Sequence, residues 1–394
     1  MSTALYKLDK ANRTVLERLF EQPAVGKMSP VAKVFVYSVL VFWSIFVIFP
    51  IYWVVITAFK DASAVNEGPY YLPFVDFQPN LDAWRTLLTA DPFCDGYAIL
   101  RQFGLLVHNS LAFLVSPLVH VDRMEPQICR VYLAFTNSLV IGVASTVLCV
   151  TIGSMAAYAL ARIAYKPKFG NIVMFVVLSL LVIVATSYAR VPWYVTSAVA
   201  LALFFLLARV FGKRFTSTLG NNDILFWIIS QRILPPIVVI IPIYMMFQAV
   251  SLLDTHLGLI IIYAVANLPI VVWLMHDFFA GLPIELEESA QLDGATRFGI
   301  FWDIVLPLTR PGLAATTLLT LILNWNEYLF AVFLTTSKAL TMPIMVAAKN
   351  SGEKGILWWE MCAVIAVMIV PVILAAIVLQ RFIARGVLLG AVKG

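Results

Sequence analysis

Eight apolar stretches of about 20 residues or more dominate this sequence of 394 residues. An α-helix rises 1.5 Å per residue, so about 20 apolar residues cross the roughly 30 Å hydrocarbon layer of a membrane. Backbone polar groups cannot stay unpaired in lipid, which favours a helix in every stretch. The sequence therefore predicts an all-α fold, a polytopic bundle of about eight transmembrane helices at residues 34–58, 134–160, 171–190, 192–210, 224–250, 258–279, 311–334 and 359–381.

The composition supports a membrane protein and excludes several function classes. Hydrophobic residues make up 61% and charged residues 12% of the chain, whereas a soluble domain has about 45–50% apolar and 25% charged residues. A net charge of only +5 argues against nucleic-acid binding. The four cysteines contain no Cys-x-x-Cys pair, and no metal or catalytic site is predicted.

The distribution of Lys and Arg predicts that both termini lie in the cytoplasm. With the N-terminus inside, 17 of the 27 basic residues fall on the cytoplasmic side, among them Arg162, Lys166 and Lys168, and nine fall on the other side. The apolar stretch 103–121 would move these three residues outside if it crossed. We therefore expect it to lie in the outer loop, on the membrane surface.

This orientation divides the chain into segments with different expected locations. Residues 1–33 are expected to form a cytoplasmic segment and residues 34–394 a transmembrane domain. Within that domain, 59–133 is expected to be an extracytoplasmic loop and 280–310 a cytoplasmic loop.

The cytoplasmic loop contains the signals of two short helices joined by a bend. Carboxylates near the start of the first helix suit the positive end of the helix dipole, and Pro283 suits its first position. Gly294 suits the left-handed position after its end, and Thr296 is a suitable N-cap for the second helix. Apolar residues then recur at helical spacing before two prolines end the helix: Phe298, Phe301, Trp302 and Val305, then Pro307 and Pro311. From this spacing alone, the loop is either a docking device or an amphipathic connector on the bilayer surface.

The same loop resembles the EAA loop of ABC-importer permeases, in which Glu-Ala-Ala, Gly, Ile and Leu-Pro follow at fixed spacing. The matching residues are Glu288, Ser289, Ala290, Gly294, Ile304, Leu306 and Pro307, and Ser289 in place of alanine is the one departure. Other segments are similar to the sugar-importer branch: 253–258, 291–296, 325–328, 340–343 and 391–394. Over about 34–90, 131–170 and 224–394, the chain resembles the smaller membrane subunit of maltose-type carbohydrate importers, with their type I importer fold.

The resemblance implies that residues 281–307 couple this chain to a separate ATPase. Glu288 would make the charged contact, Ala290 the close packing and Gly294 the bend. The whole set of implied coupling residues is Glu287, Glu288, Ser289, Ala290, Asp293, Gly294, Ile304, Leu306 and Pro307.

The resemblance also implies partners and a location. The partners would be a homologous permease subunit, two ATPase subunits and an extracytoplasmic sugar-binding protein, in a bacterial inner membrane. The chain contains no Gly-x-x-x-x-Gly-Lys-Ser/Thr loop. ATP and Mg would therefore be bound by the ATPase, and this chain would be a transport subunit that holds no cofactor and is not an enzyme.

Polar residues recur along one expected face of the seventh span. Thr317, Thr320, Asn324, Glu327 and Tyr328 lie at offsets of 3, 7, 10 and 11 from the first. A carboxylate inside a membrane is costly unless it faces a cavity or a partner. Thr320, Asn324, Glu327 and Tyr328 are therefore candidates for a wall of the substrate path. Hydrogen bonds between helices, which would hold the bundle together, are the alternative.

Two insertions depart from the family pattern. An extra hydrophobic hairpin occupies about 171–222, and the outer loop is enlarged at about 92–130. Cys94 and Cys129 both fall in the enlarged loop, where an oxidising periplasm would permit a disulfide; two unrelated thiols are the alternative. In the second span, small residues from Gly142 to Ala157 form a stripe that predicts a helix-packing face.

The rival hypothesis from another class is an ion-coupled secondary transporter of a small solute. Such a transporter needs an intramembrane ion site and usually has internal repeats. The sequence offers one intramembrane carboxylate, Glu327, and no clear repeat.

Overall fold

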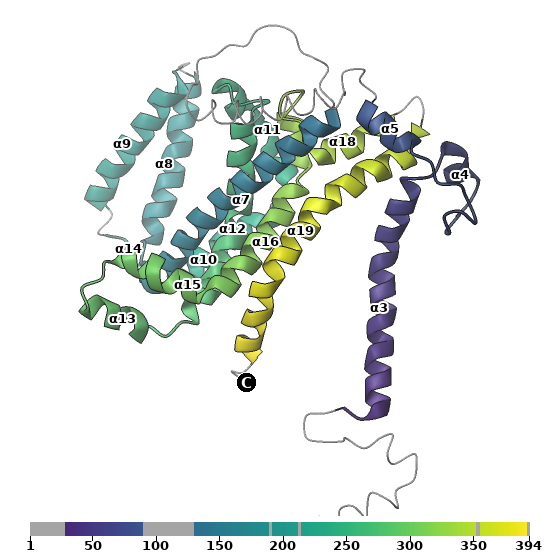
Figure 1. Ribbon diagram of the computed structural model, residues 1–394. Helices are drawn as coiled ribbons and strands as arrows, with labels where there is room; N and C mark the ends of the chain where they lie inside the picture. The colour runs from purple at the N-terminus through teal and green to yellow at the C-terminus, as the bar shows by residue number, and fades with distance from the viewer. Residues whose placement is uncertain (1–27, 90–129, 189–190, 212–213, 352–354, 392–394) are drawn as a thin grey trace, which may run out of the picture. The chain divides into compact units, whose positions relative to one another are not determined.

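The structure is a computed structural model that describes residues 28–89, 130–188, 191–211, 214–351 and 355–391 (Figure 1). Regular structure in these ranges is helical, except for β1 (Asn350–Ser351) and β2 (Gly355–Ile356), which pair antiparallel. The all-α prediction is confirmed. The enlarged outer loop, with Cys94 and Cys129, lies outside the described residues.

The chain forms two compact units. The first combines the N-terminal residues up to 123 with 349–367, and the second contains 124–348 and 368–394. In the first unit the described elements are α3 (Pro30–Thr57), α4 (Ala62–Glu67), α5 (Asp82–Thr89), both strands and the beginning of α19 (Trp358–Ala391).

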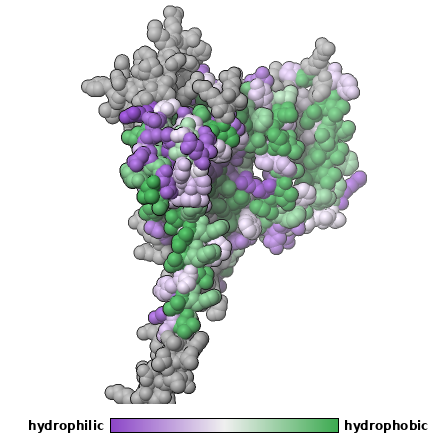
Figure 2. All heavy atoms as spheres, turned by 90° about the vertical axis from the view of Figure 1, so that its right-hand side faces the viewer, coloured by the Kyte–Doolittle hydropathy of each residue, from purple (hydrophilic) through white to green (hydrophobic). Residues whose placement is uncertain are grey.

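Helix α3 begins at Ser29, whose hydroxyl accepts a hydrogen bond from the Ala32 N–H at 3.3 Å. Pro30 occupies its first turn, where a missing N–H costs nothing. Large apolar side chains, such as Phe42 and Phe46, are exposed along the helix. Figure 2 shows one face of the protein, on which hydrophobic side chains cover much of the helical surface. Lipid or another apolar surface must cover α3.

A buried lysine fixes the segment that follows α3. Lys60 is 1% exposed, and its Nζ donates to the carbonyl of Tyr70 at 2.6 Å. The same ammonium group lies 4.3 Å from the centre of the Trp53 ring, within cation–π distance. Burial lowers the pKa of Lys60 below its ordinary value. The ammonium group therefore joins the end of α3 to the loop around Tyr70.

The centre of the second unit is the packing of α7 (Arg130–Arg162) against α12 (His256–Ala280), with α16 (Arg310–Trp325) beside them. The small-residue stripe of α7 faces these helices, and Ser145, Cys149 and Ala157 are fully buried. At Gly153 an added Cβ would lie only 2.5 Å from Val271 Cγ1 on α12. The predicted packing face is therefore confirmed, because small residues let the two helices approach closely.

Each of the eight predicted spans contains helix, although the fifth and the seventh are broken. Among the described residues, four helices are long and apolar enough to cross a membrane: 30–57, 131–162, 256–280 and 358–380. Two more candidates are bent helix pairs, within 221–249 and 297–325. The extra hairpin consists of α8 (Phe169–Tyr188) and α9 (Trp193–Phe211), which pack side by side and whose apolar parts are shorter (Figure 1).

The fifth span is broken at two prolines. Helix α10 (Asn221–Ser230) continues into η2 (Gln231–Ile233), and α11 (Pro236–Ala249) then leaves at 89°. Pro235 and Pro236 lack N–H groups and cannot continue the helical ladder. The Arg232 guanidinium donates to the Ala266 carbonyl at 2.9 Å, which attaches the bend to α12.

The prediction of one continuous seventh span is wrong. Helix α16 ends at Trp325, and a separate helix, α17 (Leu329–Leu334), follows. The carboxylate of Glu327 accepts a hydrogen bond from the Phe330 N–H at 3.2 Å, at the start of α17. This side chain competes with the helical ladder and favours a break. Glu327 and Tyr328 therefore do not continue the polar face of α16.

A carboxylate ties the loop before α12 to the loop after α17. Asp254 has φ +55°, and its carboxylate accepts hydrogen bonds from the backbone N–H groups of residues 336–339 at 3.0–3.2 Å. The hydroxyls of Thr336 and Ser337 also donate to it, at 2.9 and 3.2 Å. Burial alone would raise the pKa of Asp254, but these donors outweigh it and hold the pKa below its ordinary value.

Asp254→Asn is expected to destabilise the protein by about 2 kcal/mol at neutral pH, because an amide cannot accept all these hydrogen bonds. A depressed folded-state pKa gives stability that is present above the unfolded pKa of about 3.9 and lost as pH falls through the folded value. Melting temperatures in detergent at several pH values should show a deficit that shrinks below about pH 4. Asp303→Asn, at an exposed carboxylate, is the control. A deficit that persists unchanged in acid would contradict this account.

Candidate functional site

The cytoplasmic loop predicted from the sequence begins where α12 ends, at Ala280. Its first helix, α13 (Glu285–Leu292), has Glu285, Glu287 and Glu288 in its first turn. These carboxylates lie at the positive end of the helix dipole, as expected. Pro283 was expected at the first helical position but lies before the N-cap residue, Ile284. The helix starts later because the Ile284 carbonyl accepts the first hydrogen bonds, from the N–H groups of residues 287 and 288.

A left-handed glycine ends α13, as predicted. Gly294 has φ +87°, and its N–H donates to the Gln291 carbonyl at 3.0 Å. The N–H of Ala295 donates to the Ala290 carbonyl, also at 3.0 Å. These two bonds form a Schellman motif, which satisfies carbonyls left free at the helix end. An added Cβ at Gly294 would meet nothing within 4 Å, so the backbone conformation, not lack of space, favours glycine.

The second helix of the loop begins at the predicted N-cap. The Thr296 hydroxyl accepts a hydrogen bond from the Gly299 N–H at 3.1 Å. The helix comprises α14 (Arg297–Gly299), the π-helical η3 (Ile300–Val305) and α15 (Leu306–Leu308). The sequence suggested that Pro307 ends this helix. In the structure, Pro307 instead lies within α15. The chain instead bends by 82° before α16.

The most buried charge of the loop is Glu287, which is 4% exposed. Its Oε1 pairs with Arg162 Nε on α7 at 2.6 Å, and its Oε2 accepts from the Tyr158 hydroxyl at 2.7 Å. Arg162 also donates from Nη2 to the carbonyl of Leu282 at 3.1 Å. A buried carboxylate needs such partners to offset its lost hydration. The loop is therefore fixed to the end of α7, a helix that lies 125 residues away in the sequence.

Apolar contacts hold the same loop against the bundle. Ala290, Ile300, Phe301 and Val305 belong to a buried cluster with residues of α7 and α12. Tyr158 of α7 lies 5.1 Å from Phe301, measured between ring centres. Ile304 and Leu306 pack against this cluster and are partly buried. Burial on this scale fixes the position of both loop helices.

The outward face of α13 carries a different set of residues. Glu288, Ser289, Asp293 and Gly294 are exposed, and Leu292 is 90% exposed. Glu287 and Ala290, predicted with them, face this chain's own interior. A helix of this kind can offer carboxylates and the apolar side chains of Leu286 and Leu292 to a partner while its other face is anchored.

Sequence reasoning missed Arg162 and Tyr158 as part of this site. Arg162 was counted only as a cytoplasmic charge. The spacing of Glu287 and Ala290, three residues apart, places them on one face of α13. This spacing was the available signal that Glu287 faces inward, but nothing in the sequence indicated which helix supplies its partner.

The structure places the predicted path residues in different environments. Asn324 is buried; its Nδ2 donates to Thr146 Oγ1 on α7 at 3.0 Å, and its Oδ1 accepts from Asn267 of α12 at 2.6 Å. Thr320 is fully buried and donates to a carbonyl of its own helix. Glu327 is partly buried in the break after α16, and Tyr328 is exposed. Asn324 therefore joins three helices of this chain by hydrogen bonds.

Comparisons with known proteins identify membrane components of transport systems as similar to this chain. A family model described as "Binding-protein-dependent transport system inner membrane component" matches residues 205–389, which contain the whole loop. The trehalose transport system permease protein SugB of Mycobacterium tuberculosis is 30% identical over 66% of this chain and 77% of its own. The diacetylchitobiose uptake system permease protein NgcG of Streptomyces coelicolor is 26% identical over 91% of this chain and 88% of its own.

One solved structure supports the fold. It is a bacterial ABC transporter involved in import of the acidic polysaccharide alginate. One of its chains matches with a TM-score of 0.50 and 18% identity, over 89% of this chain and 96% of that chain.

Proposed function

This chain belongs to the family of binding-protein-dependent transport system inner membrane components, and on that premise we propose that it is the sugar-conducting membrane subunit of an ATP-driven carbohydrate importer. It is a multi-pass inner-membrane protein and a transport component. Membership of this family decides against the ion-coupled secondary transporter.

The relatives favour a carbohydrate as the substrate. SugB is named for trehalose and NgcG for diacetylchitobiose, both of which are disaccharides. We propose a disaccharide or short oligosaccharide for this chain. Binding of a panel of such sugars to the cognate binding protein, measured by calorimetry, would identify the substrate. A binding protein that takes only amino acids or metal ions would contradict the proposal.

The proposed assembly pairs this chain with a homologous permease subunit, two ATPase subunits and an extracytoplasmic sugar-binding protein. ATP and Mg would be bound by the ATPase subunits. Closure of these subunits on ATP would move the loop formed by α13–α15, and the transmembrane helices would change from inward-open to outward-open. The ATPase contact then biases a two-state element, and the loop transmits that bias.

The geometry of α13 is the observation that carries the coupling proposal. Glu288 and Ser289 lie on an exposed face, and Glu287 on the opposite face is buried against α7. A partner that pushes on the exposed face therefore displaces a helix already fixed to the bundle. The 82° bend next to α16 directs the same displacement into a transmembrane helix.

Glu288→Lys is expected to abolish sugar-stimulated ATP hydrolysis while the protein still inserts and folds. The change replaces an attraction by a repulsion at a partly buried charged contact. The measurement is ATPase activity of the purified complex in nanodiscs, with binding protein and sugar. Glu67→Lys, at an exposed glutamate of α4 outside this loop, is the matched control and should retain stimulation. Full stimulation of the Glu288→Lys complex would contradict the coupling role of this face.

The same face tests the proposed orientation. In a cysteine-free background, Ser289→Cys should resist a membrane-impermeant thiol reagent added to intact cells and react after lysis. Labelling in intact cells would place the loop outside and overturn both the orientation and the ATPase contact.

A further inference from the structure

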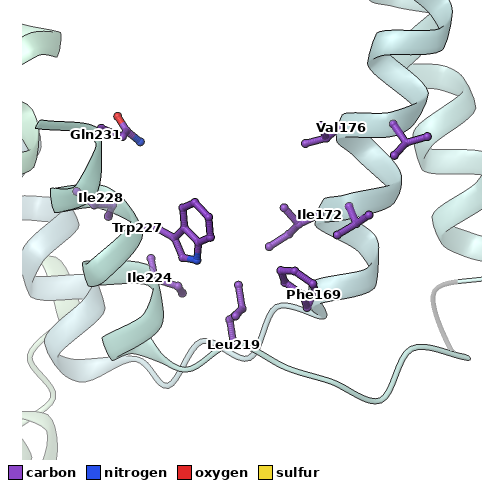
Figure 3. A pocket seen from close by; sticks show the side chains of 10 residues that line it. Phe169, Ile172, Val176, Leu219, Ile224, Trp227, Ile228 and Gln231 are labelled. Carbon is purple, nitrogen blue, oxygen red and sulfur yellow. The ribbon is translucent and has the colours of Figure 1, made fainter. Parts of the chain in front are cut away.

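A cavity of about 510 Å³ lies between the inserted hairpin and the broken fifth span. Its walls are residues 169–177 of α8 and residues 219–231, which include α10. Figure 3 shows Trp227 pointing from α10 into the cavity toward Phe169 and Ile172, with Leu219 at one end. Nine of the ten lining side chains are apolar, and Gln231 is the polar one.

The cavity opens to the surface of this chain. Trp227 is 59% exposed, and Val176 and Val177 are about half exposed on the opposite wall. Both walls belong to predicted transmembrane segments, where the surroundings are hydrocarbon. Exposed apolar walls at this depth need an apolar occupant from the membrane or from another chain.

Basic residues occur in the two connections next to the Phe169–Leu219 end of the cavity. There, the two connections that flank the hairpin run side by side: the Phe169 N–H donates to the Ser217 carbonyl at 3.0 Å, and the Leu219 N–H donates to the Pro167 carbonyl at 2.9 Å. This pairing brings together the segments that carry Lys166, Lys168 and Arg214. The Arg214 guanidinium also lies 5.5 Å from the centre of the Phe211 ring.

The acidic residue Asp223 follows these connections in the sequence. The carboxylate of Asp223 accepts a hydrogen bond from the Gly220 N–H at 2.8 Å, and Asp223 is in the first turn of α10. The segments 164–168 and 214–223 thus hold three basic residues and one acidic residue, so together they carry net positive charge.

We propose that this cavity binds an anionic phospholipid. An acyl chain lies between α8 and α10, and the phosphate headgroup lies against the basic residues at the Phe169–Leu219 end. Basic sites beside transmembrane helices recognise anionic headgroups. A phospholipid has an apolar acyl chain that matches the apolar walls and a charged headgroup that matches the charged end. A partner helix fits less well, because close helix packing favours small residues, whereas the large side chains of Trp227 and Phe169 line the two walls of this cavity. The site lies between an insertion and the fifth span, and its ten lining residues are outside the coupling loop.

Photochemical crosslinking in nanodiscs tests the proposal on the purified complex. The probe is phosphatidylglycerol with a diazirine in its acyl chain, and the products are mapped by mass spectrometry. Crosslinks should concentrate on residues 169–177 and 219–231. Unlabelled phosphatidylglycerol should compete, and phosphatidylcholine should not.

Charge variants separate headgroup recognition from general contact with lipid. The double change Lys166→Glu and Arg214→Glu lies in exposed connections and should reduce crosslinking by roughly tenfold. Lys33→Glu, at an exposed basic residue in the first turn of α3, is the matched control and should leave it unchanged. Val176→Trp should reduce crosslinking by filling the cavity.

Three results would overturn the proposal. The first is equal competition by phosphatidylcholine, and the second is labelling spread evenly over α3 and the hairpin. The third is a protein, in place of lipid, captured by a photoreactive residue introduced at Val176.

Discussion

Glu287→Ala is expected to release the coupling loop, which is formed by α13–α15, from the helix bundle. The change is also expected to abolish sugar-stimulated ATP hydrolysis. The change leaves Arg162, whose side chain is 12% exposed, without its carboxylate partner at 2.6 Å. Breaking a buried ion pair by removing one partner costs about 3–5 kcal/mol, because the remaining charge is uncompensated. Hydrogen exchange of residues 281–295 in the purified complex should rise, and the melting temperature should fall.

Two further variants separate the ion pair from the helix itself. Glu288→Ala changes the exposed neighbour and should leave hydrogen exchange and the melting temperature unchanged. Replacing both partners, with Arg162→Met and Glu287→Met together, should cost less than either single change, because no buried charge remains unpaired. If Glu287→Ala is as stable as Glu288→Ala, the ion pair does not anchor the loop.

Gly153→Leu is expected to prevent α7 from packing against α12 and to reduce the yield of folded protein sharply. Even the Cβ of alanine would lie 2.5 Å from Val271 Cγ1 and 2.9 Å from Val271 Cβ. Overpacking of this kind costs about 1–3 kcal/mol for a small added group and more for a large one. Size-exclusion profiles and melting temperatures of the detergent-solubilised protein measure the effect.

A second glycine of the same stripe provides the control. At Gly142 an added Cβ would lie 3.6 Å from the Trp325 ring, an ordinary van der Waals contact. Gly142→Ala should therefore be nearly neutral, whereas Gly153→Ala should be clearly destabilising. Val271→Ala should rescue Gly153→Ala in part, since it removes Cγ1 but keeps Cβ. Equal effects of the two alanine changes would contradict close packing at Gly153.

Features set by neighbouring residues were predictable from the sequence. Gly294 and Thr296 act through their own backbone, and the structure confirms the bend and the cap that they predicted. The paired prolines at 235–236 break the fifth span for the same local reason. The spans were predictable for a related reason: the membrane demands long apolar helices whatever their partners.

Features set by distant residues were not predictable. The partner of Glu287 is Arg162, on another helix, and no local pattern links the two. Likewise, the offsets used for the seventh span assumed an unbroken helix. The carboxylate of Glu327 instead caps α17, so position along a regular helix no longer predicts which side chains share a face.

The attachment of α13 to three helices determines which helices move when a force acts on the loop. The loop is covalently joined to α12 on one side and to α16 on the other, and Arg162 adds a non-covalent link to the end of α7. Helix α7 has 33 residues and is therefore about 50 Å long. When such a long helix tilts about its loop end, even a small change in angle displaces its opposite end by a large distance. The ion pair between Glu287 and Arg162 thus transmits a displacement of the loop to α7, the longest helix of the second unit. The strength of this ion pair limits how much force the loop can transmit to α7.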